Sequence, residues 1–355
     1  MNKYKKFLHS NYRIGTLFLL IVCLFCLSAC SRGNENDKIP ANSQKSDSPI
    51  IFADDSWDSI QIHNRIAGLI IKNGYGYPVK YLSGETKLTW QALSHSDLDV
   101  IMEVWSGNNQ AVWESIYKNN SVRMVGINYT GAEQGWYVPT YLVEGDVERG
   151  IEPAAPNLKS VQDLNRYAKL FADFAAAPKG IIYNSPPAWN SHPINLSKFN
   201  AYKLSGNFVL QTTGSDKELD SSLAKAYEKA QPWVGYGFSP LITAKYKMTL
   251  LKEPAFNQYQ WERNQACAYP ETEVAITVSR KLLDKAPELV DFLSKYKTNL
   301  EQNETVLRYL AEHDDDKDAA ALYFLQQYPD VWKEWVPEAI AIKVEEALLK
   351  TTPKK

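Results

Sequence analysis

Residues 49–71 read PIIFADDSWDSIQIHNRIAGLII and change from one hydrophobic pattern to another within a single segment. The first four residues form a short apolar, β-prone run that stops at the polar Asp54 and Asp55. Ser56 can cap a helix, and from Ile60 onward apolar side chains recur at the spacing of one helix face. A strand followed directly by an amphipathic helix is typical of a βαβ unit, so this segment predicts an α/β fold.

Short apolar runs and helical patterns continue to alternate along the chain. The further strands are expected at residues 79–82, 98–105, 135–142, 180–183, 208–211, 233–236, 249–251 and 273–278. The further helices are expected at residues 88–93, 110–117, 161–174, 193–202, 215–229 and from 286 onward. Helices of this length between strands predict two lobes, each with a mostly parallel sheet flanked by helices. We place the first lobe in residues 50–140 and 240–349 and the second in residues 141–239.

The N-terminus has the pattern of an export signal. Four basic residues precede an apolar run at residues 16–27, and no acidic residue occurs among the first 29. The run is too short to span a bilayer comfortably. It ends in Leu27-Ser28-Ala29-Cys30, which resembles the lipobox of bacterial lipoproteins. That resemblance implies removal of residues 1–29 and diacylation of Cys30; an ordinary signal peptide or an uncleaved anchor helix is the alternative.

Residues 30–49 contain almost no large apolar side chains and are expected to form a flexible tether. Two acyl chains hold a protein firmly to a membrane surface, so we expect an extracytoplasmic, lipid-anchored protein. With Cys23 and Cys26 removed and Cys30 acylated, only Cys267 remains, and no intramolecular disulfide can form. Packing alone must therefore stabilise the folded body, which we expect to be a monomer.

The composition excludes several other functions. Without the four basic residues of the signal, 35 basic side chains stand against 41 acidic ones, which argues against a nucleic-acid partner. The five histidines form no His-Glu-x-x-His or similar ligand spacing, and the chain has no Gly-x-Ser-x-Gly elbow or phosphate-binding glycine loop. We therefore expect no enzyme, no metal site and no cofactor; turnover of a candidate ester would reveal a hydrolase instead.

Each loop at the end of a central predicted strand carries an aromatic residue. These residues are Trp57, Trp105, Trp189, Tyr236 and Phe238. In open α/β sheets ligands lie beyond the carboxyl ends of the strands, so we expect the rings to meet at one site. A quaternary ammonium group has no hydrogen to donate, but aromatic faces attract it with roughly 0.5 to 2 kcal/mol per ring. Any one of these tryptophans alone is more often a core residue, and the hypothesis rests on their shared position.

Residues 183–193, YNSPPAWNSHP, add a polar element to this site. Pro193 suits the first turn of a helix, which puts Asn190 and Ser191 at or near a helix N-terminus. Unpaired backbone N–H groups there favour a carboxylate. A cation cage beside a helix start would suit a betaine, while an ordinary N-cap is the alternative role for Ser191.

Several motifs resemble the glycine betaine, choline and proline-betaine substrate-binding proteins of ABC importers, over nearly the whole mature body. The motifs are DDSW (54–57), MEVW (102–105), GWYVP (135–139), PAWN (187–190), PWVGYGFSP (232–240), NETV (303–306) and VWKEWV (331–336). The resemblance implies a two-lobed, type II periplasmic-binding-protein fold. It also implies that the protein captures a quaternary ammonium osmolyte and delivers it to an ABC transporter permease. Glycine betaine is the first candidate for this ligand. Choline, carnitine and proline betaine are the alternative ligands.

The resemblance assigns the aromatic residues to a ligand cage. Trp105 and Trp189 match cage positions of the family, and Trp57 matches a cage tryptophan of its choline-binding branch. Phe238 stands where a cage tryptophan is expected, which makes Tyr236 the candidate substitute. We therefore expect the three tryptophans at the ligand, with either Phe238 or Tyr236 completing the cage.

The resemblance also assigns polar residues. Asn109 stands where some members place a histidine that contacts the ligand carboxylate, and Asn190 and Ser191 stand where backbone amides do so. Ser59 replaces the acidic residue that meets the choline hydroxyl in the choline-binding branch, which favours a betaine. A receptor of the same fold that reports the ligand to a sensor protein is the other candidate function; a permease and an ATPase encoded alongside would favour transport.

Overall fold

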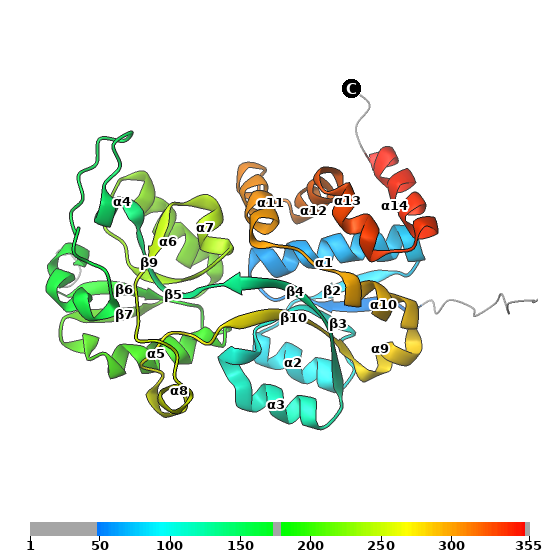
Figure 1. The fold of residues 1–355 in the computed structure, drawn as a ribbon, viewed down its shortest axis with the longest axis horizontal. Coiled ribbons are helices and arrows are strands. Elements are labelled where there is room, and N and C mark those ends of the chain that lie inside the picture. Colours follow the sequence, from blue (N-terminus) through cyan, green and yellow to red (C-terminus); the bar gives the residue numbers. More distant parts are fainter. Residues whose placement is uncertain (1–47, 173–178, 352–355) are drawn as a thin grey trace, which may run out of the picture. The chain divides into compact units, whose positions relative to one another are not determined.

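The computed structural model describes residues 48–172 and 179–351 (Figure 1). The predicted signal peptide, Cys30 and most of the predicted tether lie outside the described residues. The helices are α1 (Asp58–Ile70), η1 (Ile71–Tyr75), α2 (Thr86–Ser94), η2 (Ser106–Asn109), α3 (Gln110–Lys118), α4 (Thr140–Glu144), η3 (Val161–Phe171), α5 (Ser191–Ala201), η4 (Leu204–Gly206), α6 (Asp216–Glu228), α7 (Leu241–Lys245), α8 (Gln258–Asn264), α9 (Arg280–Lys285), α10 (Pro287–Lys295), α11 (Leu300–Glu312), α12 (Lys317–Gln327), α13 (Pro329–Trp332), η5 (Lys333–Trp335) and α14 (Glu338–Thr351). Within these ranges no helix is long and apolar enough to cross a bilayer.

Five strands form the first sheet, in the order β2-β1-β3-β10-β4. They are β1 (Ile50–Ala53), β2 (Val79–Leu82), β3 (Val100–Val104), β4 (Val122–Ala132) and β10 (Thr272–Ser279). β1 pairs in parallel with β2 and β3, whereas β10 is antiparallel to both β3 and β4. In Figure 1, α1, α11 and α12 lie on one side of this sheet, and α2 and α3 lie on the other.

The second sheet repeats this plan in the order β7-β6-β8-β5-β9. Its strands are β5 (Gln134–Pro139), β6 (Gly180–Asn184), β7 (Phe208–Thr212), β8 (Gly235–Phe238) and β9 (Met248–Leu250). β6 pairs in parallel with β7 and β8, and β5 is antiparallel to β8 and β9. Helices α6 and α7 lie on one side of the sheet and α5 and α8 on the other (Figure 1).

Both sheets are mixed, which corrects the prediction of mostly parallel sheets. The strands on either side of a crossover helix are parallel, as predicted, but β4 runs into β5 with only Glu133 between them. The chain thus enters the second sheet directly as a strand, and no crossover helix turns it into the parallel direction. β5 and β9 both belong to the second sheet, so the lobe boundaries predicted at 140 and 240 also move. The chain crosses near residue 133 and again between residues 250 and 272.

The first strand–helix unit folds for the predicted reason, with one difference at the helix start. Ile60, Ile66 and Ile70 of α1 are at most 1% exposed, so the predicted apolar face is the buried one. Trp57, and not Ser56, is the N-cap residue of α1, and its side chain makes no capping hydrogen bond. The hydroxyl of Ser56 accepts a hydrogen bond from the second lobe instead, as described below.

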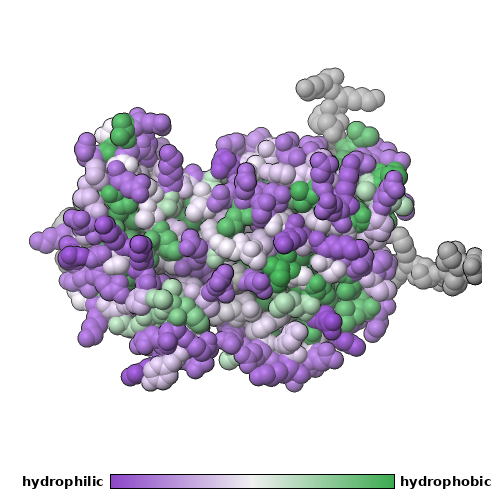
Figure 2. All heavy atoms as spheres, in the orientation of Figure 1, coloured by the Kyte–Doolittle hydropathy of each residue, from purple (hydrophilic) through white to green (hydrophobic). Residues whose placement is uncertain are grey.

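Each lobe has its own aromatic core. Trp136 and Trp233 lie in the interior of the second lobe, at most 2% exposed, and Trp233 stacks on Tyr183 with ring centroids 5.9 Å apart. In the first lobe, Phe292 packs edge to face on Tyr296, and both are fully buried. The face of the molecule seen in Figure 2 is largely hydrophilic, with hydrophobic side chains in small patches. Each lobe thus has buried aromatic contacts of its own, in addition to those that join the two lobes.

Candidate ligand-binding site

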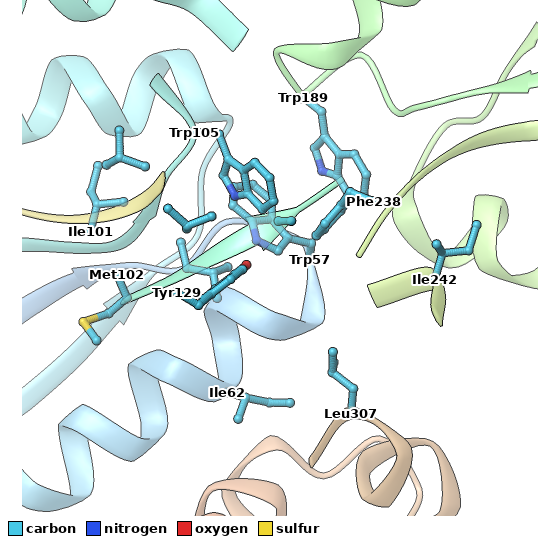
Figure 3. Close-up of a cluster of buried hydrophobic side chains, with 14 of the residues drawn as sticks. Trp57, Ile62, Ile101, Met102, Trp105, Tyr129, Trp189, Phe238, Ile242 and Leu307 are labelled. Carbon is cyan, nitrogen blue, oxygen red and sulfur yellow. The ribbon is translucent and has the colours of Figure 1, made fainter. Parts of the chain in front are cut away.

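The five predicted aromatic residues meet at one place, and they come from both lobes. Trp57 lies at the start of α1 and Trp105 directly after β3, both in the first lobe. Trp189 lies in the loop between β6 and α5, and Tyr236 and Phe238 lie on β8, all in the second lobe. Figure 3 shows the rings of Trp57, Trp105, Trp189 and Phe238 gathered together. Strand ends of the two sheets therefore face each other, as the position of the loops predicted.

The rings contact one another edge to face across the lobe boundary. The ring centroids of Trp57 and Trp189 are 5.9 Å apart, and those of Trp105 and Phe238 are 5.2 Å apart. Phe238 also lies 5.9 Å from Trp189, and Tyr236 lies 6.3 Å from Trp189. All five side chains are 3–8% exposed. Trp105 and Trp189 are thus neither far apart nor packed separately inside their own lobes.

A small cavity of about 30 Å³ lies among these rings and has a polar wall. Its lining residues are Trp57, Thr86, Trp105, Asn108, Gln134, Trp189, Asn190, Ser191, Tyr236 and Phe238. Seven of the eight predicted binding residues are among them. Asn109 is not, and the preceding Asn108 lines the cavity instead. Both residues belong to η2, and the role of Asn109 at the ligand stays a prediction.

Gln134, which the sequence analysis missed, organises the polar wall. Its side-chain oxygen accepts hydrogen bonds from the amide of Asn108 at 2.8 Å and from the hydroxyl of Tyr236 at 3.0 Å. Its own amide donates to Asn108 Oδ1 at 3.2 Å. Gln134 is the first residue of β5, at the crossing between the lobes. The sequence analysis missed Gln134 because it placed the lobe boundary at residue 140. That boundary put Gln134 inside the first lobe and away from the predicted site.

The start of α5 forms the rest of the polar wall. The helix begins at Ser191, with Asn190 as its N-cap residue, in agreement with the prediction for this segment. Backbone N–H groups in the first turn of a helix have no partner within the helix. The side-chain amide nitrogen of Asn190 is also buried, and it has no hydrogen-bond partner among the described residues. This wall can therefore donate hydrogen bonds to an anionic group.

The three indole N–H groups are all held away from the cavity. Trp57 Nε1 and Trp105 Nε1 both donate to Oε2 of Glu103, at 2.7 Å and 3.2 Å. Trp189 Nε1 donates to the hydroxyl of Ser56 at 2.8 Å and so links the two lobes. With their polar edges fixed in this way, the indoles can present their apolar faces to a ligand.

Two buried carboxyl groups lie beneath the rings. Burial raises the pKa of Glu103 to about 7, although hydrogen bonds from Trp57 and other neighbours lower it. Burial also raises the pKa of Asp55 to about 7; the hydrogen bond from Thr89 lowers it, while the charges of Asp54 and Glu103 raise it further. Burial lowers the pKa of His63 to about 3, so this ring is neutral at physiological pH.

A larger cavity of about 460 Å³ adjoins the first and shares Trp189, Tyr236 and Phe238 with it. Two lysines, Lys217 and Lys245, line it and pair with aspartates there. The aspartates outnumber them and come from both lobes, namely Asp58, Asp216, Asp220, Asp314 and Asp315. Its aromatic residues all belong to the second lobe, so a cation there would meet no ring from the first. We therefore place the binding site in the smaller cavity, where both lobes contribute rings. The acidic surroundings of the larger cavity favour the approach of a cation.

Comparison with known proteins agrees with this geometry. The family described as the substrate-binding domain of the ABC-type glycine betaine transport system, OpuAC, matches residues 48–327. The chain belongs to this family. Members are binding domains and not an enzyme class, as the composition led us to expect of this chain.

Several solved structures share the fold. Lactococcal OpuAC, in a closed conformation with glycine betaine, is 19% identical with a TM-score of 0.64, over 82% of this chain and 100% of that one. A choline-binding protein of an ABC transporter, in complex with choline, is 19% identical with a TM-score of 0.66, over 84% and 98%. The glycine betaine/L-proline-binding protein ProX of Borrelia burgdorferi is 14% identical with a TM-score of 0.66, over 84% and 100%. The two-lobed, type II periplasmic-binding-protein fold is thereby confirmed.

The raised pKa of Asp55 makes the stability of this OpuAC member depend on pH. The pKa of Asp55 is about 7 in the folded state, against the ordinary value of 3.8 that applies when the chain is unfolded. Between pH 3.8 and pH 7 the folded state therefore binds more protons than the unfolded state. Stability is therefore lost as the pH rises through this window. We expect Asp55→Asn, which cannot ionise, to gain about 2 to 4 kcal/mol relative to the wild type between pH 4 and pH 7.5.

Guanidinium chloride unfolding at both pH values measures this difference. The exposed Asp97 supplies the control, since Asp97→Asn should follow the wild type at each pH. A stability difference between Asp55→Asn and the wild type that does not change with pH would contradict the prediction.

Proposed function

We propose that the protein is the extracytoplasmic receptor of an ABC importer and captures a quaternary ammonium osmolyte, glycine betaine in the first place. The observation that carries this proposal is the ring cluster: three indoles and Phe238, contributed by two lobes, surround one cavity. A methylated nitrogen offers no N–H group, so hydrogen-bond acceptors cannot recognise it. Ring faces can, through cation–π attraction that grows when water is excluded.

The two ends of a betaine fit the two kinds of wall. The methylated nitrogen would lie among Trp57, Trp105, Trp189 and Phe238, with Tyr236 at the edge of the cluster. The carboxylate would face the start of α5, where backbone N–H groups and the partnerless amide of Asn190 can donate to it. Such an arrangement satisfies both charges of a zwitterion within one small site.

The polar wall favours a carboxylate over the hydroxyl of choline. No carboxylate side chain lines the cavity, and the carbonyl oxygen of Gln134 already accepts two hydrogen bonds. Ser59, the residue that replaces the acidic group of choline-binding relatives, is buried beside Glu103 and not in the cavity wall. Choline, carnitine and proline betaine remain the alternative ligands, and a ligand-reporting receptor remains the alternative function.

Transport by this mechanism needs two lobes that close on the ligand. Several polar contacts span the lobes around the site, besides those between Asn108 and Gln134. They include Trp189 to Ser56 at 2.8 Å, Thr86 to Ala188 at 3.3 Å and Thr243 to Glu304 at 2.6 Å. A ligand that contacts rings from both lobes would add to these contacts and shift the population towards the closed form. The closed protein, which we propose is monomeric, would then dock on the permease.

Isothermal titration calorimetry with glycine betaine, choline, carnitine and proline tests the ligand class. We expect glycine betaine to bind most tightly, because it alone offers both a trimethylammonium group and a carboxylate at the separation of this small cavity. Proline, which has no methylated nitrogen, serves as the matched zwitterionic control. Absence of binding below about millimolar for every methylated amine would contradict the proposal.

Replacing Trp189 tests the cage itself. Trp189→Ala removes a ring that contacts both Trp57 and Phe238, and we expect binding to weaken by about 1 to 3 kcal/mol. Trp113→Ala is the control: Trp113 is 8% exposed, close to the 7% of Trp189, but packs on Trp90 away from the cavity. Calorimetry of both variants with glycine betaine, after circular dichroism has shown both to be folded, makes the comparison. Equal affinities would make Trp189 a core residue.

We also propose that Cys30 anchors the mature protein to the outer side of the cell membrane. The lipobox-like LSAC at residues 27–30 supports this proposal. In cells fed a labelled fatty acid, we expect the wild type to carry the label and sediment with membranes. Cys30→Ala should lose both properties, whereas Cys267→Ala, at the buried thiol of the folded body, should keep them. A labelled Cys30→Ala variant would show that another residue is acylated.

A further inference from the structure

A single carboxylate, Glu103, lies directly behind two rings of the cage. Glu103 is on β3, and its side chain is fully buried. One oxygen, Oε2, accepts the indole N–H groups of both Trp57 and Trp105, which come from different elements of the first lobe. Figure 3 shows these two indoles side by side, with Tyr129 below them. The orientation of both rings is therefore fixed by one acceptor.

Among the described residues, no positively charged side chain pairs with Glu103. The nearest basic group is the ring of His63 on α1, whose Nε2 lies 3.7 Å from Glu103 Oε1. That ring is neutral, and its other nitrogen is engaged with the hydroxyl of Tyr296 at 2.8 Å. The other titratable groups that face Glu103 are Tyr129 on β4, Tyr296 at the end of α10 and Asp55 after β1, and none of them can supply a positive charge.

A buried carboxylate without a basic partner is costly, and proteins normally pair or neutralise such a group. Protonation is one solution, and burial does raise the pKa of Glu103 to about 7. The other solution is a cation nearby. Both indoles line the cavity proposed to hold the ligand, so a quaternary ammonium in this cavity would lie across the rings from the carboxylate.

We propose that Glu103 is the charge-supplying and ring-positioning residue of the site: it orients Trp57 and Trp105 and pairs, through their rings, with the positive charge of the ligand. This inference rests on the proposed function and deepens it, because it makes the positive charge, and not only the methylated shape, the recognised feature. Hydrogen bonds to an ionised acceptor are stronger than neutral ones and increase the electron density of the donor ring. The attraction also acts in a medium of low effective dielectric constant.

Two consequences separate this role from a purely structural one. Binding of a permanent cation favours the ionised form of Glu103, so the cation should bind more tightly as the pH rises through about 7. A ligand of the same shape that has an uncharged quaternary centre, and so no positive charge, should not benefit from the carboxylate. The anion of tert-butylacetic acid is such a ligand, because a carbon atom replaces the nitrogen of glycine betaine and the carboxylate is kept.

The experiment compares the wild type with Glu103→Gln, which keeps the size and the accepting oxygen of the side chain but not its charge. At pH 8 we expect the variant to lose roughly 10- to 100-fold in affinity for glycine betaine. Its affinity for tert-butylacetate should not fall. Between pH 8 and pH 5.5 the wild type should lose several-fold in affinity for glycine betaine, whereas the profile of the variant should be flat.

Asp55→Asn is the control for the pH profile, because Asp55 is buried nearby and titrates in the same range. We expect this variant to keep the pH dependence of the wild type. The inference is overturned if Glu103→Gln weakens both ligands equally, if it leaves the pH profile unchanged, or if Asp55→Asn abolishes that profile. Failure of the proposed function looks different, since the wild type would then bind no methylated amine at any pH.

Discussion

The site depends on one constraint of topology: the carboxyl ends of the parallel strands in the two sheets face each other. Trp57 and Trp105 follow the ends of β1 and β3 in the first lobe. In the second lobe, Trp189 follows β6, and Phe238 is the last residue of β8. Neither lobe alone could surround a cation, because each contributes rings from one side only. The crossing strands, β4 with β5 and β9 with β10, hold the two edges opposite each other. Mixed sheets are the structural consequence of these crossings.

The lobes are joined near the site by contacts that are individually weak. The ion pairs between Lys245 and Asp58, at 3.8 Å, and between Lys217 and Asp315, at 3.6 Å, are long and partly or largely exposed to solvent. Pairs of this kind contribute at most about 1 kcal/mol each. Apolar contacts also cross the boundary, among the rings and where α7 packs on α11. A ligand that inserts among the rings would exchange ring–ring contacts for contacts with its own methyl groups. A protein that must both bind and release needs such a balance.

The sequence pointed to every aromatic residue that lines the candidate cavity, but to only some of the polar residues that line it. Strand ends are visible in the hydrophobic pattern, and tryptophan is rare enough for its position after Val104 or Pro187 to be informative. Gln134 was missed because its place depends on where the chain crosses between lobes. The antiparallel strand β5 has no pattern that distinguishes it from a parallel strand of the first lobe.

Glu103 was missed for a different reason, although a signal was present. Residues 98–105, LDVIMEVW, form a nearly continuous apolar run in which a carboxylate is out of place. Charged side chains are almost never fully buried unless they are paired. An unexplained carboxylate two residues before a cage tryptophan could therefore have been read as a residue of the site. Only the structure shows that it binds two indoles at once, because Trp57 is 46 residues away in the chain.

The way in which the indole N–H groups are used also determines what the site rejects. Trp57 and Trp105 donate to Glu103, and Trp189 donates to Ser56, so the rings are held by their edges. The cavity then offers ring faces and donors of hydrogen bonds, and no carboxylate among its lining residues. A primary ammonium group would lose its hydration there without finding acceptors for its three N–H groups, which is costly. A methylated ammonium loses little, since it had no hydrogen bonds to water to give up. Under the proposed function, the walls that would attract a betaine would therefore discriminate against ordinary amines and amino acids.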